Sequence, residues 1–340
     1  MYKLKTPTME SKIYYFIDNL TENDPREEII ISENLILKNV PDNLILALKS
    51  NIKQFICHSR LPEIFKNEFP NTFHEFEKVK DIPPYGIQTK QRGKEDFRYL
   101  VLEESKSNKY NSIYPKAFSL AEKDYFIPFA FSNYDNGFSI KVSFSELCIF
   151  TYYNDLSVIQ PWRKRQNPNG FSENDKKEVI EYINLLYEFE KIKEDFPFIN
   201  KALNDFFLVR EVSDYSVFKI VSYIACLEML LVDSSQERLK SITVQLQTKL
   251  NLLNNQFEKP VIISEYIKGP DTLKLGNVIE VFYNYRSSIA HGNFLDFKKK
   301  LQLLEAVSEN EIFNFIRTVL KKTLIYALKN PELVRDLKEC

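Results

Sequence analysis

DTLKLGNVIEVFYNYRSSIAHG, residues 271–292, decides what fold we expect for the second half of the chain. Its apolar residues recur at steps of three and four, the spacing that places side chains on one face of an α-helix. We therefore predict a helix over residues 271–291 that packs against a core. Its apolar stripe consists of Leu275, Val278, Ile279, Phe282, Tyr285 and Ile289.

Arg286 lies four residues after Phe282 and continues the apolar row, so its guanidinium extends from the core-facing side of the helix. A charge in that position needs a partner, because an unpaired buried charge is costly. Glu228 is the one acid in the apolar stretch 215–232. We predict that Glu228 pairs with Arg286 and orients its guanidinium. The alternative is that Glu228 lies at the rim of a helical bundle, where its carboxylate reaches solvent.

His291 follows Arg286 by five residues, and Gly292 can take the left-handed conformation that commonly ends a helix. The open carbonyls at a helix C-terminus favour a protonated imidazole, so His291 is suited to hold or pass a proton near neutral pH. Arginine has planar donors that match phosphate oxygens. Five residues correspond to about 500° of helix rotation, so the two side chains diverge by about 140°. Two antiparallel copies of the helix would bring them together, which predicts a homodimer.

The segment YRSSIAHG, with FKIVSYIACLEMLLV at residues 218–232, resembles the Apea-like branch of the HEPN superfamily. The signature of that family is an arginine, four to six residues, and a histidine, which Arg286 and His291 match. The resemblance covers about residues 172–330. It implies an all-α HEPN bundle and a homodimeric, metal-independent endoribonuclease without a cofactor. Arg286 would bind the scissile phosphate, and His291 would act as general acid or base.

The same resemblance implies a cytoplasmic toxin of prokaryotic antiphage defence or abortive infection, which cleaves RNA to a 2′,3′-cyclic phosphate. Ser287 stands where many HEPN nucleases have Asn, Asp or His, although its hydroxyl can still donate to a phosphate. The alternative is therefore a catalytically inactive HEPN module that binds RNA, a nucleotide or a partner protein. A third alternative is an assembly protein in which helix 271–291 forms a dimer seam. Tyr283 and Asn284 flank the motif and are candidates to line an RNA site.

The composition is that of a globular protein of two or three domains, with 340 residues of which 44% are hydrophobic and 27% charged. The net charge of −1 means that any contact with nucleic acid requires a local basic patch. The four cysteines are scattered without a CxxC pair, which favours reduced thiols in a cytosol. The first residues lack the apolar segment of a signal peptide, and the run 215–232 is too short and too charged to span a membrane.

Neither a metal site nor a nucleotide cofactor is predicted. His58 and His74 lack ligands at metal-binding spacing, and the chain contains no GxxxxGK[ST], GxGxxG or HExxH motif. The linker at residues 161–175 ends in a helix cap. Its cluster Trp162, Arg163, Lys164 and Arg165 combines an aromatic surface with positive charge, as a weak RNA contact would, although linkers are often composed in this way.

The expected fold class is α+β. Residues 1–165 form an N-terminal α+β domain, with a sensing or regulatory role and a phage-derived or protein trigger, and residues 166–340 form a HEPN-like helical domain. In the first domain we expect a helix over residues 42–56, a hairpin at 133–137, and strands at 27–32, 34–40, 97–103, 125–131, 137–144 and 147–153. In the second we expect helices at 174–194, 197–210, 215–232, 236–254, 271–291 and 308–329.

Overall fold

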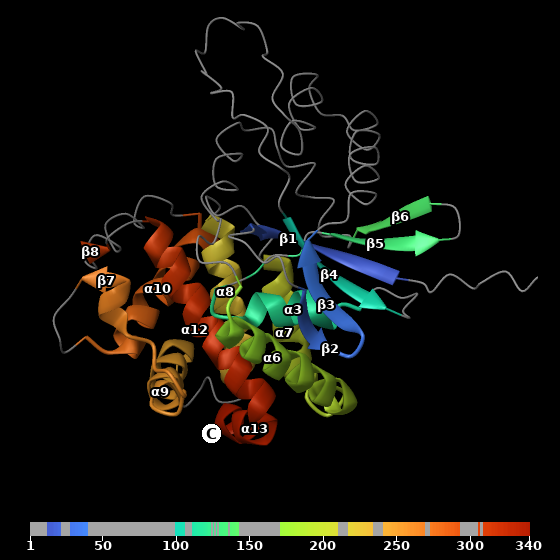
Figure 1. Cartoon of the computed structure of the whole chain (residues 1–340). Helices are drawn as coiled ribbons and strands as arrows, with labels where there is room; N and C mark the ends of the chain where they lie inside the picture. The colour runs from blue at the N-terminus through green and yellow to red at the C-terminus, as the bar shows by residue number, and fades with distance from the viewer. Residues whose placement is uncertain are drawn as a thin grey trace, which may run out of the picture. The chain divides into compact units, whose positions relative to one another are not determined.

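Antiparallel strands and helices both build the protein, which belongs to the α+β class (Figure 1). The chain divides into two compact units, Met1–Ile183 and Asn184–Cys340. The predicted helix 42–56, the strand 147–153, His58 and His74 lie outside the described residues. The computed structural model describes residues 12–21, 28–39, 99–105, 111–123, 125, 127, 129–134, 137–142, 171–209, 217–233, 241–268, 273–292, 305–306 and 309–340.

The first unit contains a six-stranded antiparallel sheet with the strand order β2-β3-β4-β1-β5-β6. Strand β1 lies inside the sheet and pairs with β4 on one side and β5 on the other. Tyr134 pairs with Gly137, which confirms the predicted hairpin. The strands are β1 (Lys12–Thr21), β2 (Ile29–Ser32), β3 (Leu35–Asn39), β4 (Tyr99–Ser105), β5 (Phe129–Tyr134) and β6 (Gly137–Val142).

Strand β1 was not predicted, because its residues do not alternate between apolar and polar. Tyr14 and Tyr15 point to opposite faces of the sheet, yet both are buried. A strand that is covered on both faces has no polar side to alternate with, so the period of two is lost. The strands predicted at 27–32, 34–40 and 137–144 contain β2, β3 and β6. The strand predicted at 97–103 overlaps β4, which continues to Ser105, and β5 begins within the segment 125–131.

Helix α3 (Ile113–Leu120) provides aromatic contacts for one face of this sheet. The rings of Tyr15 and Tyr114 meet edge to face, with centroids 5.4 Å apart. Both hydroxyls donate to the carboxylate of Glu104, at 3.0 Å and 2.9 Å. Helix α3 was not predicted, because eight residues are too few to show a helical period.

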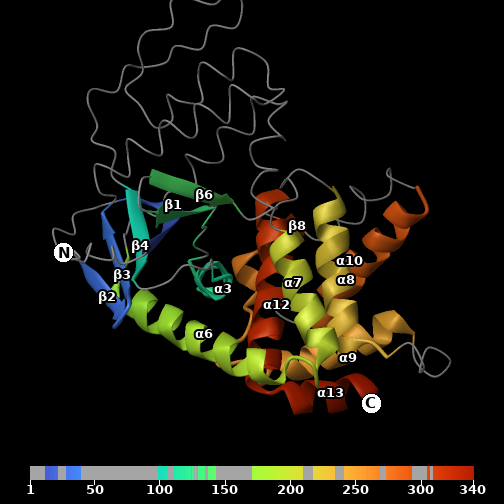
Figure 2. The ribbon, with the colours of Figure 1, turned by 90° about the vertical axis from the view of Figure 1, so that its right-hand side faces the viewer.

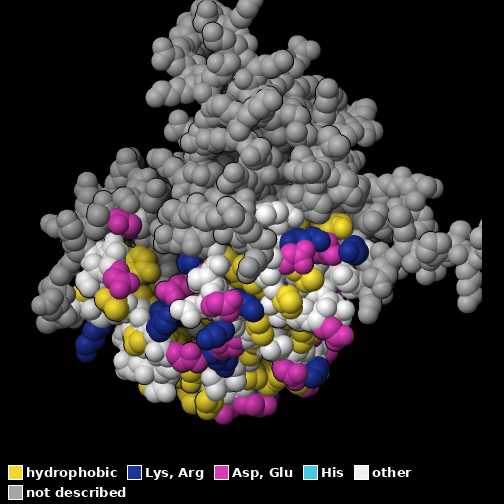
Figure 3. Space-filling model, in the orientation of Figure 1, with side chains coloured by type: hydrophobic (Ala, Val, Ile, Leu, Met, Phe, Trp, Pro, Cys, Tyr) yellow, Lys and Arg dark blue, Asp and Glu magenta, His cyan; other side chains and the backbone are white. Residues whose placement is uncertain are grey.

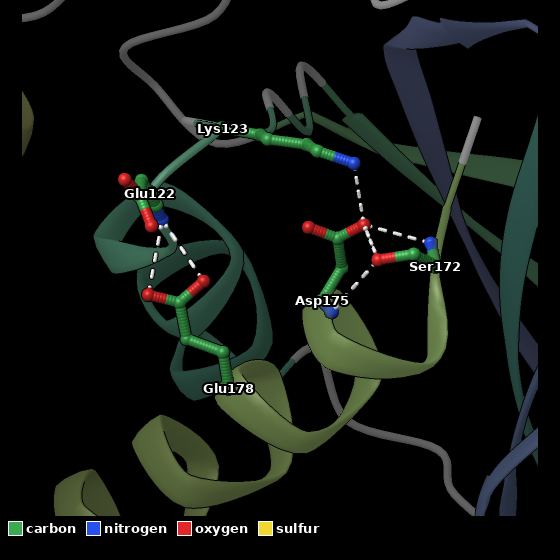
Figure 4. Close-up of polar contacts among 5 residues, drawn as sticks. All are labelled: Glu122, Lys123, Ser172, Asp175 and Glu178. Carbon is green, nitrogen blue, oxygen red and sulfur yellow. Dashed lines mark hydrogen bonds and ion pairs between the residues drawn. The ribbon is translucent and has the colours of Figure 1, made fainter. Parts of the chain in front are cut away.

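Helix α6 (Glu173–Ile192) begins with a reciprocal cap, in agreement with the predicted cap at the end of the linker (Figure 4). The backbone N–H of Ser172 donates to Oδ2 of Asp175 at 2.7 Å, and the N–H of Asp175 donates to the Ser172 hydroxyl at 3.2 Å. Lys123 adds an ammonium to the same carboxylate oxygen at 2.6 Å. Burial alone would raise the pKa of Asp175, but the hydrogen bonds from Lys123 and Ser172 outweigh it and hold the pKa below its usual 3.8.

The first prediction concerns Asp175→Asn, which should lower the free energy of unfolding by about 1–2 kcal/mol near neutral pH. Because the folded pKa is depressed, the stability that Asp175 contributes is present above 3.8 and is lost as the pH falls through the folded pKa. Urea denaturation followed by circular dichroism at several pH values measures this difference. The exposed neighbour Asn174→Ala is the control and should change stability by less than about 0.5 kcal/mol. If Asp175→Asn lowers the free energy of unfolding by the same amount at neutral and acid pH, the depressed pKa of Asp175 is contradicted.

The second unit is mainly helical. Each helix that was predicted after residue 195 contains one of the described helices. Helix α13 and the two-residue strands β7 (Ile267–Lys268) and β8 (Glu305–Ala306) were not expected, so the unit is not purely α-helical. The helices are α7 (Pro197–Val209), α8 (Val217–Leu231), α9 (Ile242–Asn254), α10 (Leu275–Ala290), α12 (Glu309–Lys329) and α13 (Pro331–Glu339).

Helix α8 is the central helix of this unit and packs against α7, α9, α10, α12 and α13 (Figure 2). Its side chains Ile224, Leu227, Leu230 and Leu231 have no accessible surface. This confirms the prediction that the run 215–232 forms a buried helix. Of the helices that the structure describes, none is both long enough and apolar enough to cross a membrane.

Helix α10 buries every residue of the predicted apolar stripe. The ring of Phe282 stacks on Phe315 of α12 at a centroid distance of 5.8 Å. Near the start of α10, the N–H of Gly276 donates to Oδ1 of Asn251 on α9 at 2.8 Å. A Cβ at Gly276 would lie 2.6 Å from Nδ2 of Asn251 and 2.9 Å from the carbonyl oxygen of Gln247. The two helices therefore approach more closely here than a side chain allows.

The second prediction is that Gly276→Ala lowers the free energy of unfolding by about 1–3 kcal/mol, because the carbonyl of Gln247 is backbone and cannot move aside easily. Alanine gains up to about 1 kcal/mol of helix propensity over glycine, and the steric effect should outweigh it. The adjacent exposed Asn277→Ala is the matched control and should change stability little. Thermal unfolding of Gly276→Ala and Asn277→Ala tests this prediction. Equal melting temperatures for the two variants would contradict a close approach of α9 and α10 at Gly276.

Candidate functional site

Arg286 and Glu228 form an ion pair between α10 and α8, with Nη2 of the arginine 3.0 Å from Oε2 of the glutamate. This confirms the predicted pairing. The Glu228 side chain retains 16% of its accessible surface and the Arg286 side chain 31%. The pair therefore lies at the edge of the core, with the guanidinium nearer to solvent than the carboxylate.

The carboxylate of Glu228 is incompletely satisfied by this arrangement. Its second oxygen, Oε1, is buried and has no hydrogen-bond partner among the described residues. Burial raises the pKa of Glu228 above its usual 4.5, and the nearby positive charge of Arg286 reduces that rise without cancelling it. Within the described part of the chain, the ionised carboxylate consequently depends on the cation of Arg286.

The guanidinium of Arg286 also lies over an aromatic ring. Its Cζ is 5.7 Å from the centroid of Tyr283, within the range of a cation–π interaction. In the part of the chain that the structure describes, its contacts are with Glu228 and Tyr283. An arginine has five N–H donors, so the ion pair through Nη2 leaves others to bind an anion.

His291 is the residue at which α10 ends. Its backbone has φ −94° and ψ 9°, and its N–H donates to the carbonyl of Ser287 at 3.1 Å. Gly292 has φ +73°, so the predicted left-handed helix end is confirmed. The His291 side chain is exposed. Because α10 stays helical to Ala290, the turn of about 140° between Arg286 and His291 separates the two side chains within one chain.

Other predicted residues extend the polar surface of α10. Asn284 and Ser287 are half-buried, and the hydroxyl of Ser288 donates to the carbonyl of Asn284 at 3.0 Å. The predicted basic cluster Trp162, Arg163, Lys164 and Arg165 lies outside the described residues.

Two lysines near the site were not predicted from the sequence. Nζ of Lys338 on α13 donates to the carbonyls of Met229 and Val232 at 2.6 Å and 2.7 Å. Nζ of Lys249 on α9 donates to the carbonyl of Leu231 at 3.0 Å. These ammonium groups satisfy open carbonyls at the C-terminal end of α8, directly after Glu228. No short motif indicates such contacts, because they join residues far apart in the chain.

The surface charge is mixed. On the face drawn in Figure 3, basic and acidic side chains of the described residues are interspersed. Within the described ranges, no group of three or more His, Cys, Asp or Glu side chains is arranged to hold a metal ion. An anion would therefore be held by local contacts such as those of Arg286, not by a broad positive field.

The class of the protein rests on its fold and this site. No protein-family model matches the chain, and neither a curated protein nor a solved structure matches it. The fold defines an α+β protein with a mainly helical C-terminal unit. The site is a partly exposed arginine, paired with a half-buried carboxylate, on a helix that ends in an exposed histidine.

The third prediction is that Arg286→Met lowers the free energy of unfolding by about 1–2 kcal/mol near neutral pH, between the values typical of exposed and buried ion pairs. Removing the cation should raise the pKa of Glu228 further. A raised carboxyl pKa means that stability falls as the pH rises above 4.5 through the folded pKa, so the loss should be smaller in acid.

The double variant Glu228→Gln with Arg286→Met should recover most of the stability lost in Arg286→Met, because it buries no unpaired charge. Urea denaturation of the four proteins at about pH 5 and about pH 7 completes the cycle. Equal and additive losses at both pH values would show that the two side chains do not interact.

Proposed function

We propose that the protein is a metal-independent endoribonuclease of the HEPN type, in which Arg286 binds the scissile phosphate and His291 acts as general acid or base. The observation that carries this proposal is the geometry of Arg286. Its guanidinium is held by Glu228 and Tyr283, remains partly exposed, and has donors left for a phosphate. The exposed His291 at the end of the same helix supplies the proton-transfer group.

These two groups are sufficient for cleavage of RNA by its own 2′-hydroxyl. The imidazole takes the proton from the 2′-hydroxyl, the 2′-oxygen attacks phosphorus, and the bond from phosphorus to the 5′-oxygen breaks. An imidazolium gives a proton to the departing 5′-oxygen. The guanidinium offsets the negative charge that develops on the phosphoryl oxygens. The products are a 2′,3′-cyclic phosphate and a free 5′-hydroxyl.

A composite site in a homodimer follows from the direction of the side chains. Arg286 and His291 diverge by about 140° on one helix, so one chain brings them together poorly. Two antiparallel copies of α10 would place the arginine of each chain beside the histidine of the other. A two-fold dimer of this kind contains two equivalent sites.

The wider role that we propose rests on the resemblance of YRSSIAHG and residues 218–232 to Apea-like HEPN proteins. Residues 166–340 would be the HEPN nuclease domain, and residues 1–165 would sense a phage-derived or protein trigger. RNA cleavage in the cytoplasm would then stop growth of an infected cell.

A second candidate is a HEPN module that binds RNA, a nucleotide or a partner protein without cleaving RNA. The pairing of Arg286 with Glu228 supports it, because a neutralised guanidinium attracts a phosphate less strongly. Ser287 in place of Asn, Asp or His beside the arginine supports it as well.

The fourth prediction is that purified protein cleaves total RNA in excess chelator, and that Arg286→Ala and His291→Ala each reduce the rate by at least about 100-fold. Denaturing gels and end-group analysis for the cyclic phosphate are the readouts, and circular dichroism tests folding. Asn277→Ala, an exposed change on the same helix, should retain the full rate.

Mixing the two inactive variants tests the composite site. Half of the randomly formed dimers would contain one of each chain, and each of these would have one intact site, so about a quarter of the rate should return. RNA binding without cleavage by the unmodified protein would favour the second candidate. Cleavage that survives both substitutions would exclude this site.

A further inference from the structure

The contact between Glu228 and Arg286 occupies part of the surface that an anion would use. Oε2 of Glu228 lies 3.0 Å from Nη2 of Arg286, a distance at which a phosphate oxygen would also bind. Oε1 of Glu228 is buried and has no hydrogen-bond partner among the described residues. The carboxylate therefore competes for the guanidinium and has little else to stabilise its charge.

Arg286 is the charged group that acts directly on Glu228. Other charged groups on the helices packed against α8 engage different atoms. Glu280 on α10 accepts from Gln247 at 2.7 Å. On α7, Lys201 and Asp205 influence Cys226. Lys249 on α9 and Lys338 on α13 bind carbonyls at the end of α8, and α12 carries the buried Lys321.

An anion at Arg286 would take the cation from Glu228 and place a second negative charge nearby. A buried carboxylate without a cation is costly in the ionised form and far less so when protonated. We propose that Glu228 is an internal competitor at the Arg286 site, and that a phosphate group binds there together with one proton that Glu228 takes up from solvent. This inference rests on the proposed function, because it assumes that Arg286 receives the phosphate.

Competition from Glu228 limits how strongly an anion binds to Arg286. While the Glu228 carboxylate is ionised it holds the guanidinium, so a simple inorganic anion binds weakly. A phosphate reaches Arg286 only by displacing Glu228. The raised pKa of Glu228 is consistent with this exchange, because the carboxyl accepts a proton more readily than an exposed glutamate does.

The fifth prediction uses sulfate, whose charge stays constant over the pH range, as the probe in titration calorimetry of the full chain. At about pH 7.5, Glu228→Gln should tighten sulfate binding by about tenfold or more, the effect of one unit of pKa. Glu280→Gln removes the same charge from α10 without touching Arg286, and should change the affinity by less than about twofold. Glu228→Met is a second neutral variant if the glutamine variant folds poorly.

The pH dependence separates competition from a merely structural role. His291 also titrates in this range, so the comparison uses a His291→Ala background. With Glu228 present, sulfate affinity should rise as the pH falls from about 7.5 to about 5.5, whereas with Glu228→Gln it should stay flat.

Unchanged or weaker sulfate binding in both neutral variants would overturn the inference. If Arg286→Met abolishes sulfate binding in the same experiment, the anion site stands and the competition alone fails. If Arg286→Met leaves sulfate binding unchanged, Arg286 is not the anion site, and the proposed function fails with it.

Discussion

The carboxylate of Glu228 is half-buried on the central helix of the C-terminal unit, and the positive charge of Arg286 offsets part of the cost of that burial. An ionised group in such a place requires its partner at a fixed distance, which ties the register of α10 to that of α8. The apolar stripe of α10 is buried in the core of this unit. The ion pair holds Arg286 facing inward at the end of that stripe. It thereby fixes where the guanidinium presents its remaining N–H donors.

The helix that carries Glu228 is itself held at its end by residues from elsewhere in the chain. Lys249 and Lys338 donate to the carbonyls of the last turn of α8, and Val232 donates back to the carbonyl of Glu228 at 2.8 Å. Through Lys338, the C-terminal helix α13 therefore supports the end of the helix that carries Glu228. Burial lowers the pKa of the half-buried Lys338 ammonium, and the nearby charge of Asp233 opposes that shift.

Asp175 in the first unit is a buried carboxylate that several donors reach. Ser172 and Lys123 donate to it, and its pKa is lowered despite burial. Among the described residues, Glu228 pairs with the cation of Arg286 and keeps one oxygen without a hydrogen bond, and its pKa is raised. The difference lies in the number of donors that reach each carboxylate. The Asp175 carboxylate, which caps α6, accepts hydrogen bonds from several donors, whereas Glu228 retains a buried oxygen with no partner among the described residues.

The sequence by itself determined the features that depend on near neighbours in the chain. The period of α10, the inward direction of Arg286, the helix end at His291 and Gly292, and the cap at Ser172 all follow from local spacing and backbone chemistry. It could also single out Glu228, because a lone acid in an apolar helix needs a cation. Tertiary structure alone decided the pairing of β1 inside the sheet, the short α3, and the lysines that close α8. Those features depend on contacts between residues far apart in sequence, and neither period nor spacing records such contacts.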